Sequence, residues 1–153
     1  MIGSRWGAYI CFGFMVASAE TAGACDELAG KLLATYVAPA IASLGCSELG
    51  RAGVDKSDHK LESVCYASEG PTSSVQVVVS LRCHTGDRAL IPVSISERVT
   101  ADAVVRGSDC AVQSAGIRPS GDIGRVLAAA FDLNGRARTA LQEGLTKLCS
   151  AGK

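Results

Sequence analysis

The chain has 153 residues, of which 48% are hydrophobic, and this is enough for one domain with a buried core. Its 15 basic and 15 acidic residues cancel, and only 5% of its residues are aromatic. A nucleic-acid-binding surface needs a basic patch, usually with stacking aromatic side chains, so the composition argues against nucleic acid as a partner. No linker, repeat or low-complexity tract divides the sequence. We therefore expect one domain over residues 20–153.

The first 19 residues have the features of a secretory signal peptide. Arg5 supplies the positive start, residues 6–17 form an uncharged and mostly apolar run, and residues 17–19 have the small-x-small pattern of a cleavage site. The apolar run is shorter than the roughly 20 residues that a membrane-spanning helix needs. We expect removal of residues 1–19, with residues 22–24 as an alternative cleavage site. The mature chain would then be periplasmic or secreted, and it would meet the membrane only through the signal peptide during export.

Loss of the signal peptide also removes Cys11 and leaves an even number of cysteines. An even number in an exported chain predicts disulfide bonds, each of which stabilises by roughly 2–4 kcal/mol. No two cysteines form a C-x-x-C pair and the chain has only two histidines, so we expect no metal and no other cofactor. Lipidation of the first remaining cysteine is an alternative that would leave one thiol unpaired. The six residues are Cys25, Cys46, Cys65, Cys83, Cys110 and Cys149.

Residues 26–44 predict an amphipathic helix, because apolar side chains recur at intervals of three and four. Asp26 suits the start of this helix and Gly45 suits its end. Pro39 lacks an amide hydrogen and is expected to kink or break the helix. A continuous helix of this length spans about 28 Å. Cys25 and Cys46 could therefore pair only if the helix really broke.

The stretch from residue 75 to residue 96 predicts an antiparallel hairpin. Apolar side chains alternate with other residues over 75–83 and again over 89–96, which gives each strand one buried face. Thr85 to Arg88 would form the tight turn, because Gly86 can adopt a positive φ. Pro92 cannot donate to a neighbouring strand, so the second strand is expected at an edge of the sheet.

Further strands are expected over residues 61–68, 99–106 and 110–117, with turns at 69–74 and 107–109. Residues 47–60 should form a polar loop. Two helices are expected at the end of the chain, over 121–133 and 136–149, with Asn134-Gly135 as the stop between them. The fold class is therefore α+β: an N-terminal helix, an antiparallel sheet of four or five strands, and C-terminal helices packed on one face, stabilised by disulfides.

No set of side chains predicts catalysis, so we expect a protein that is not an enzyme. His84 stands at the hairpin tip and His59 stands in the polar loop, and both fit solvated turn positions. The sequence has no G-x-S-x-G motif and no Cys-His signature of a nucleophilic enzyme. A small hydrolase that uses one of these histidines is the least favoured alternative.

Several short motifs between residues 56 and 127 share an order with a known family. Residues 58–61 read D-x-x-L before Cys65, and a strand of alternating valines ends in Cys83. A Pro-Val pair follows at 92–93, then V-x-x-G-x-D at 104–109 and G-R-V-L at 124–127. In these features the chain resembles the periplasmic chaperones that assist assembly of the flagellar P-ring.

The resemblance implies a Cys65–Cys83 disulfide and a surface that holds an exported subunit until it polymerises. A tight turn at residues 70–74 would instead place Cys65 opposite residue 78 or 79, so the disulfide would require Cys65 to lie outside that ladder. The pairing of the cysteines therefore stays open at this point.

Two functions remain, and both need a partner that is another exported protein. The first is a non-catalytic binding or assembly protein. A chaperone for an exported structural subunit would be one form of it. The second is an inhibitor or immunity protein that blocks an enzyme or toxin with a rigid loop. A chaperone would act through a sheet edge or a helix-covered face. The loop expected to contact the partner, above all in an inhibitor, consists of Thr85, Gly86, Asp87 and Arg88.

Overall fold

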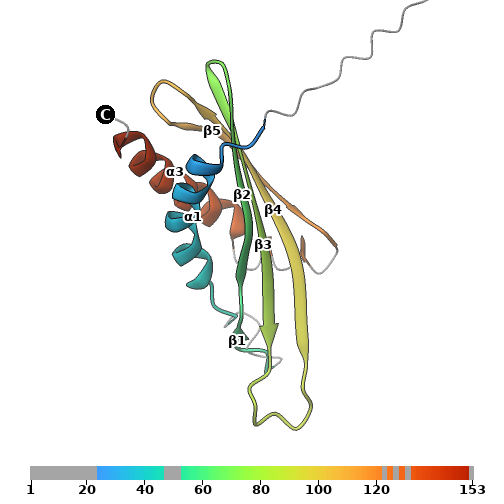
Figure 1. Ribbon diagram of the computed structural model, residues 1–153. Coiled ribbons are helices and arrows are strands. Elements are labelled where there is room, and N and C mark those ends of the chain that lie inside the picture. Colours follow the sequence, from blue (N-terminus) through green and yellow to red (C-terminus); the bar gives the residue numbers. More distant parts are fainter. Residues whose placement is uncertain (1–23, 47–52, 122–123, 126–127, 130–131, 152–153) are drawn as a thin grey trace, which may run out of the picture.

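The computed structural model describes residues 24–46, 53–121, 124–125, 128–129 and 132–151. The expected signal peptide, residues 1–19, lies outside these residues. The elements in chain order are α1 (Glu27–Ala42), β1 (Lys56–Ser57), β2 (Lys60–Glu69), β3 (Thr72–His84), β4 (Ser94–Arg106), β5 (Val112–Pro119) and α3 (Leu133–Ala151). Figure 1 shows two layers, a long twisted sheet with both helices on one face. The α+β class, the antiparallel sheet and the helical cover are therefore confirmed.

Strand β3 is the centre of the sheet. Strand β4 pairs with it along its whole length, from Thr72 opposite Arg106 to His84 opposite Ser94, and β5 pairs with the far side of β4. Strands β1 and β2 both pair with the other side of β3 and follow one another along the same edge. All pairs are antiparallel. The short β1 was not expected, because residues 47–60 read as a loop.

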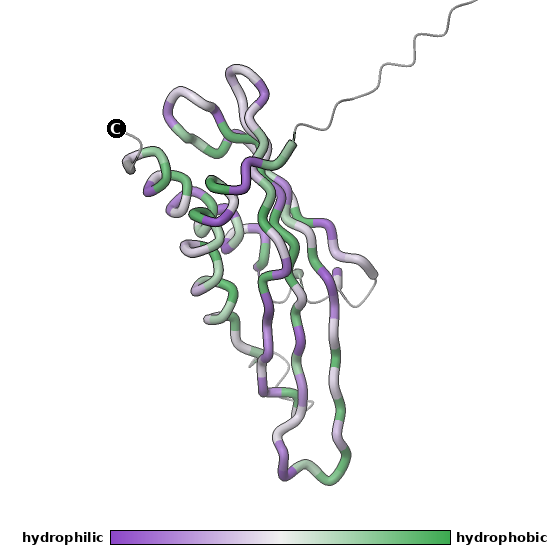
Figure 2. The backbone as a smooth tube through the Cα atoms, viewed as in Figure 1, coloured by the Kyte–Doolittle hydropathy of each residue, from purple (hydrophilic) through white to green (hydrophobic). Residues whose placement is uncertain are grey.

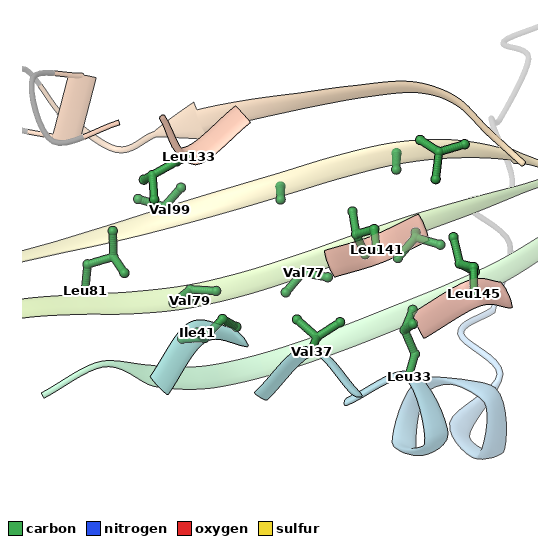
Figure 3. Close-up of a cluster of buried hydrophobic side chains, with 14 of the residues drawn as sticks. Leu33, Val37, Ile41, Val77, Val79, Leu81, Val99, Leu133, Leu141 and Leu145 are labelled. Carbon is green, nitrogen blue, oxygen red and sulfur yellow. The ribbon is translucent and has the colours of Figure 1, made fainter. Parts of the chain in front are cut away.

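The core lies between one sheet face and the two helices. Alternate residues of β3 and β4 are buried, as period-two alternation in a half-buried strand requires. Figure 3 shows these side chains meeting apolar side chains of α1 and α3. Figure 2 shows that hydrophilic and hydrophobic residues also alternate along the strands. The main buried residues are Leu33, Val37, Ile41, Val75, Val77, Val79, Leu81, Val99, Val105, Leu133, Leu141 and Leu145.

All six expected cysteines form disulfides. Cys25 pairs with Cys65, Cys46 with Cys83, and Cys110 with Cys149, at Cα–Cα distances of 5.1, 5.8 and 6.5 Å. The first two disulfides join the chain at either end of α1 to strands β2 and β3. The third joins the turn between β4 and β5 to α3. The sulfur of Cys25 is engaged, so it cannot carry the lipid that the alternative reading required.

The Cys65–Cys83 pairing implied by the resemblance is wrong. Cys65 stands in the ladder opposite Gln76, whereas Cys83 lies seven residues further along β3. Seven residues of strand span roughly 23 Å, and an odd offset puts the two side chains on opposite faces of the sheet. Cys83 faces the helices, where Cys46 arrives from the end of α1.

Helix α1 does not break at Pro39. It continues to Ala42, and Asp26 caps its start by accepting a hydrogen bond from the amide of Ala29 at 2.9 Å. Pro39 stands in the last turn, so only one helical hydrogen bond is lost there. Buried Val37 and Ile41 on either side of the proline hold this turn against the sheet.

The hairpin turn was predicted too short. Residues 85–93 form one long loop, and β4 starts only at Ser94 and then runs without interruption through the segment expected as a separate strand. Pro92 lies in this loop and not in an edge strand. The amide of Thr85 donates to the carbonyl of Val93 at 3.0 Å and closes the loop below the proline. The alternation over 89–93 therefore reflects exposed loop residues rather than a strand.

The chain turns before Asn134-Gly135, which lie inside the first turn of α3. Asp132 has a φ of 46° and accepts the amide of Arg136 on its carbonyl at 3.1 Å and the amide of Gly135 on its carboxylate at 3.4 Å. A β-carbon at Gly135 would stand 2.5 Å from this carboxylate, so the glycine makes room for the cap. Residues 124–125 and 128–129 are helical, and the rest of the expected helix over 121–133 lies mostly outside the described residues.

Candidate functional site

The loop between β3 and β4, residues 85–93, is the feature of the fold best placed to meet another molecule. Figure 1 shows it at the far end of the two longest strands, projecting beyond both helices. We call it the β3–β4 loop. It contains the four residues expected to contact a partner and five more, residues 89–93, which were expected in a strand.

The base of the β3–β4 loop is fixed by hydrogen bonds. The amide of Thr85 donates to the carbonyl of Val93 at 3.0 Å, and the amide of Val93 donates to Oγ1 of Thr85 at 3.1 Å. Within the loop, the amide of Ala89 donates to the carbonyl of Gly86 at 3.0 Å. Thr85 and Gly86 are half-buried, so they shape the base of the loop.

The tip of the loop exposes large apolar side chains. Leu90 and Ile91 have exposed fractions of 101% and 74%, and Val93 at the base of the loop is 42% exposed. Asp87 and Arg88 are also exposed, and neither forms a salt bridge within the described part of the chain. Leucine and isoleucine gain free energy when they leave water, so adjacent exposed ones mark a surface suited to association.

The charged half of this surface, Asp87 and Arg88, was predictable from the sequence, whereas the apolar half was not. Alternating apolar residues next to a strand read as more strand, and the pattern alone does not reveal that they lack an opposing ladder. Pro92 was the one indication in this stretch that regular strand pairing ends there, because a proline cannot donate a hydrogen bond to a neighbouring strand.

The two histidines lie near the base of the loop and have structural roles. His84 donates from Nδ1 to the carbonyl of Thr85 at 2.8 Å. His59 lies between β1 and β2, and its Nδ1 accepts the amide of Arg82 at 3.1 Å, in place of a backbone carbonyl. Both side chains were expected to be solvated, but both are half-buried.

Burial lowers the pKa of His59 below its usual value, although a hydrogen bond with the backbone of Leu44 and the charge of Asp58 oppose this. The direction suits its role, because Nδ1 can accept the Arg82 amide only while it carries no proton. His59 therefore completes the strand pairing where β1 and β2 are interrupted.

Cys46, His59 and Cys83 bring three possible metal-ligand atoms within 4.8 Å of one another. Cys46 Sγ lies 3.9 Å from His59 Nε2. Zinc binds cysteine as the thiolate, but both sulfurs are joined in the Cys46–Cys83 disulfide. In this oxidised form the cluster is a structural anchor behind the β3–β4 loop.

The sheet face away from the helices carries paired charges. Arg118 donates to both carboxylate oxygens of Asp102, at 2.6 and 2.8 Å, and Gln76 donates to the same carboxylate at 3.0 Å. Burial raises the pKa of Asp102, but the hydrogen bonds and the charge of Arg118 outweigh it and hold the pKa below its usual value. The carboxylate is thus ionised and engaged, which is the arrangement of a cross-strand ladder and not of a general acid.

These features define a small disulfide-bonded α+β protein, with helices on one face of its sheet and an apolar-tipped loop at its end. Neither helix of the described chain is long and apolar enough to cross a membrane. The Y4fE family model matches residues 31–149, and the chain belongs to the Y4fE family. No curated protein matches the chain. No solved structure matches it.

Proposed function

We propose that this protein is an exported, non-catalytic binding protein that contacts another exported protein through the β3–β4 loop. The observation that carries the proposal is the full exposure of Leu90 and the high exposure of Ile91 on a projecting loop. Such side chains become stabilising when a partner buries them, and a few buried anchors contribute most of the free energy of an interface.

The chemistry of the loop favours a protein surface over a membrane surface. Membrane-binding segments combine apolar residues with lysine or arginine in excess and often with Trp or Phe. Residues 85–93 contain no aromatic residue, and the charges of Asp87 and Arg88 cancel. An apolar centre with one charge of each sign beside it matches the core and rim of a protein interface.

The loop is also held before any partner arrives. Its base is closed by the Thr85–Val93 hydrogen bonds, and the Cys46–Cys83 disulfide anchors β3 one residue before the strand ends. Association costs less conformational entropy when the contacting segment is already ordered. This supports a role in binding for the loop.

The compartment is part of the proposal. Three disulfides are typical of an oxidising compartment, and the apolar start of the sequence fits an export signal, so we place the mature chain in the periplasm or outside the cell. A chaperone for an exported structural subunit, as the P-ring resemblance implies, is the particular form of binding protein that we favour.

The test places a photo-crosslinking amino acid at Leu90 in the exported protein. We expect one discrete crosslinked partner in cells, and we expect its loss when Ile91 is changed to Asp. The matched control carries the crosslinker at Leu28, which is 71% exposed in the first turn of α1. Figure 1 shows that this end of α1 lies away from the loop. Equal crosslinking at both positions, or none at Leu90, would contradict the proposal.

The same loop also supports the inhibitor or immunity function as a second candidate. The observation that favours it is the disulfide beside the base of the loop, because inhibitors commonly insert a rigid, covalently held loop. The crosslinked partner would then be an enzyme or toxin. Exchanging Asp87 and Arg88 should abolish its inhibition, and unchanged inhibition would exclude the loop as the inhibitory element.

A further inference from the structure

The two edges of the sheet differ in how they are covered. At the β2 edge, the amide of Asp26 before α1 donates to the carbonyl of Tyr66 at 2.7 Å. A β-carbon at Gly30 of α1 would stand 2.9 Å from the carbonyl oxygen of Val64 on the same edge. At the opposite edge β5 is the last strand, and none of residues 113–118 is buried. An uncovered edge can pair with a further strand, and natural proteins usually protect it.

The hydrogen bonds of the sheet show which backbone groups of β5 face outward. The amide of Ser120 donates to the carbonyl of Arg98 at 3.1 Å, and the register of β4 and β5 places these two residues opposite each other. In an antiparallel pair, hydrogen-bonded residues alternate with residues whose backbone groups point away from the neighbouring strand. Over 114–118 the even-numbered residues therefore bond to β4, and Ala115 and Ile117 point outward. Within the described residues, the amides and carbonyls of Ala115 and Ile117 have no hydrogen-bond partner.

The unpaired part of β5 is closed off at both ends. At its start, the amide of Val112 donates to Oε1 of Gln142 on α3 at 2.9 Å, and the register shifts before residue 114. At its end, Pro119 has no amide hydrogen to offer. We call residues 114–118 the β5 edge. Its two outward-facing residues can form about four hydrogen bonds with an added strand.

Arginine side chains lie beside the β5 edge. Arg118 of the strand itself is paired with Asp102 of β4 at 2.6 Å. Arg138 stands one helical turn before Gln142, so it shares the face of α3 that contacts the start of β5. Arg138 is exposed, and among the described residues it forms no salt bridge. Its charge suits a strand with acidic side chains, whereas a second copy of the chain would bring the same arginines.

We propose that the β5 edge pairs with an extended, acidic segment of the exported partner. The backbone of the segment bonds to the free groups of Ala115 and Ile117, and its carboxylates lie near Arg138. Its apolar side chains extend the core beside Ala115 and Ile117, which are half-buried at the rim of the core. In such strand addition, main-chain hydrogen bonds give affinity and alternate side chains give specificity. The inference rests on the proposed function, since the segment belongs to the partner that the β3–β4 loop contacts.

Nuclear magnetic resonance of the purified, fully oxidised protein tests the proposal, with a short blocked peptide of alternating valine and glutamate as the probe. In the free protein, the amide hydrogens of Ala115 and Ile117 should exchange quickly, and those of Gly116 and Arg118 slowly. Saturation with the peptide should slow exchange at Ala115 and Ile117 at least about tenfold. The absence of saturable binding, or binding without this protection, would overturn the proposal.

A proline substitution tests the backbone contact. Ala115→Pro removes one outward amide hydrogen and leaves the ladder with β4 intact, since proline is tolerated where the amide faces away from the neighbouring strand. It should weaken peptide binding about tenfold, whereas Ala115→Val keeps the amide and should bind within about twofold of the wild type. A melting temperature close to the wild-type value shows that Ala115→Pro is folded. If it is not, Ile117→Pro makes the same change two residues along. Equal binding by the proline and valine variants would overturn strand addition.

The acidic character of the segment has its own test. Arg138→Gln should weaken binding of the glutamate peptide about threefold. Arg136→Gln makes the same charge change on a different face of α3 and should have no effect. A peptide with lysine in place of glutamate should bind more weakly than the glutamate peptide. Equal losses in the two variants, or tighter binding of the lysine peptide, would overturn the role of Arg138. Peptide binding does not involve the β3–β4 loop, so this proposal and the crosslinking at Leu90 can fail separately.

Discussion

Replacing the disulfides one at a time with serine pairs should show that Cys46–Cys83 is the most important for stability. The three disulfides join residues separated by 40, 37 and 39 positions. The loop-closure entropy removed from the unfolded chain depends on the logarithm of this separation and corresponds to about 4 kcal/mol for each one. Entropy alone therefore predicts nearly equal losses.

The Cys25–Cys65 disulfide is the matched control for Cys46–Cys83. The two loops interleave along the chain, so each is partly closed by the other and both lose somewhat less than the isolated value. The difference lies in the folded state, because Cys46 and Cys83 are 0% and 2% exposed whereas Cys25 is exposed and Cys65 is half-buried. Burying serine hydroxyls in place of the sulfurs costs about 1–3 kcal/mol more.

The measurement is urea unfolding of the three double variants, with the free energy of unfolding extrapolated to water. Peptide mapping of each variant must first show that the other two disulfides have formed. The Cys46→Ser/Cys83→Ser variant should be less stable than the Cys25→Ser/Cys65→Ser variant by at least about 1 kcal/mol. If the control variant loses as much free energy or more, burial of the second disulfide is not what distinguishes the two.

Three further outcomes are expected from the same unfolding assay. Leu145→Ala, at a fully buried position, should cost about 2–5 kcal/mol, whereas Leu90→Ala on the exposed loop should stay within about 0.5 kcal/mol; similar values for both would contradict the described core. Gly30→Ala should destabilise despite the better helix propensity of alanine, because the new β-carbon would lie 2.9 Å from the carbonyl oxygen of Val64; a gain in stability would show that α1 can move away from β2. The pKa of His59 is lowered by burial, so the unfolded state binds the proton more readily, and stability should fall as the pH drops below the unfolded value of about 6.5. The His59→Gln variant should show a flatter dependence between pH 7.5 and 5, and an unchanged slope would assign the effect to other groups.

The local elements were largely predictable from the sequence because their signals are periodic. The alternating valines of β3 and the three-four spacing of α1 follow directly from which faces must leave water. The same reasoning failed where a local signal has two readings. The alternation over 89–93 read as strand but lies in the loop, and Asn134-Gly135 read as a stop although Gly135 makes room for the Asp132 cap.

The candidate binding surface was half predictable for a related reason. Asp87 and Arg88 stand beside a glycine, and charged residues in a turn are easily assigned to the surface. The exposure of Leu90 and Ile91 depends on the absence of any packing neighbour, which no local pattern encodes. Their side chains look the same in sequence as those of a buried strand.

By itself, the sequence determined that six cysteines would pair, that one sheet face would be apolar and that helices would cover it, because composition and periodicity act locally. Only the tertiary structure decided which cysteines pair. Cys65 and Cys83 lie on opposite faces of the sheet, whereas the packing of α1 along β2 brings Cys25 to Cys65 and Cys46 to Cys83. Contacts between residues far apart in the chain depend on how the helices pack on the sheet. The projection of the β3–β4 loop beyond both helices depends on the same packing.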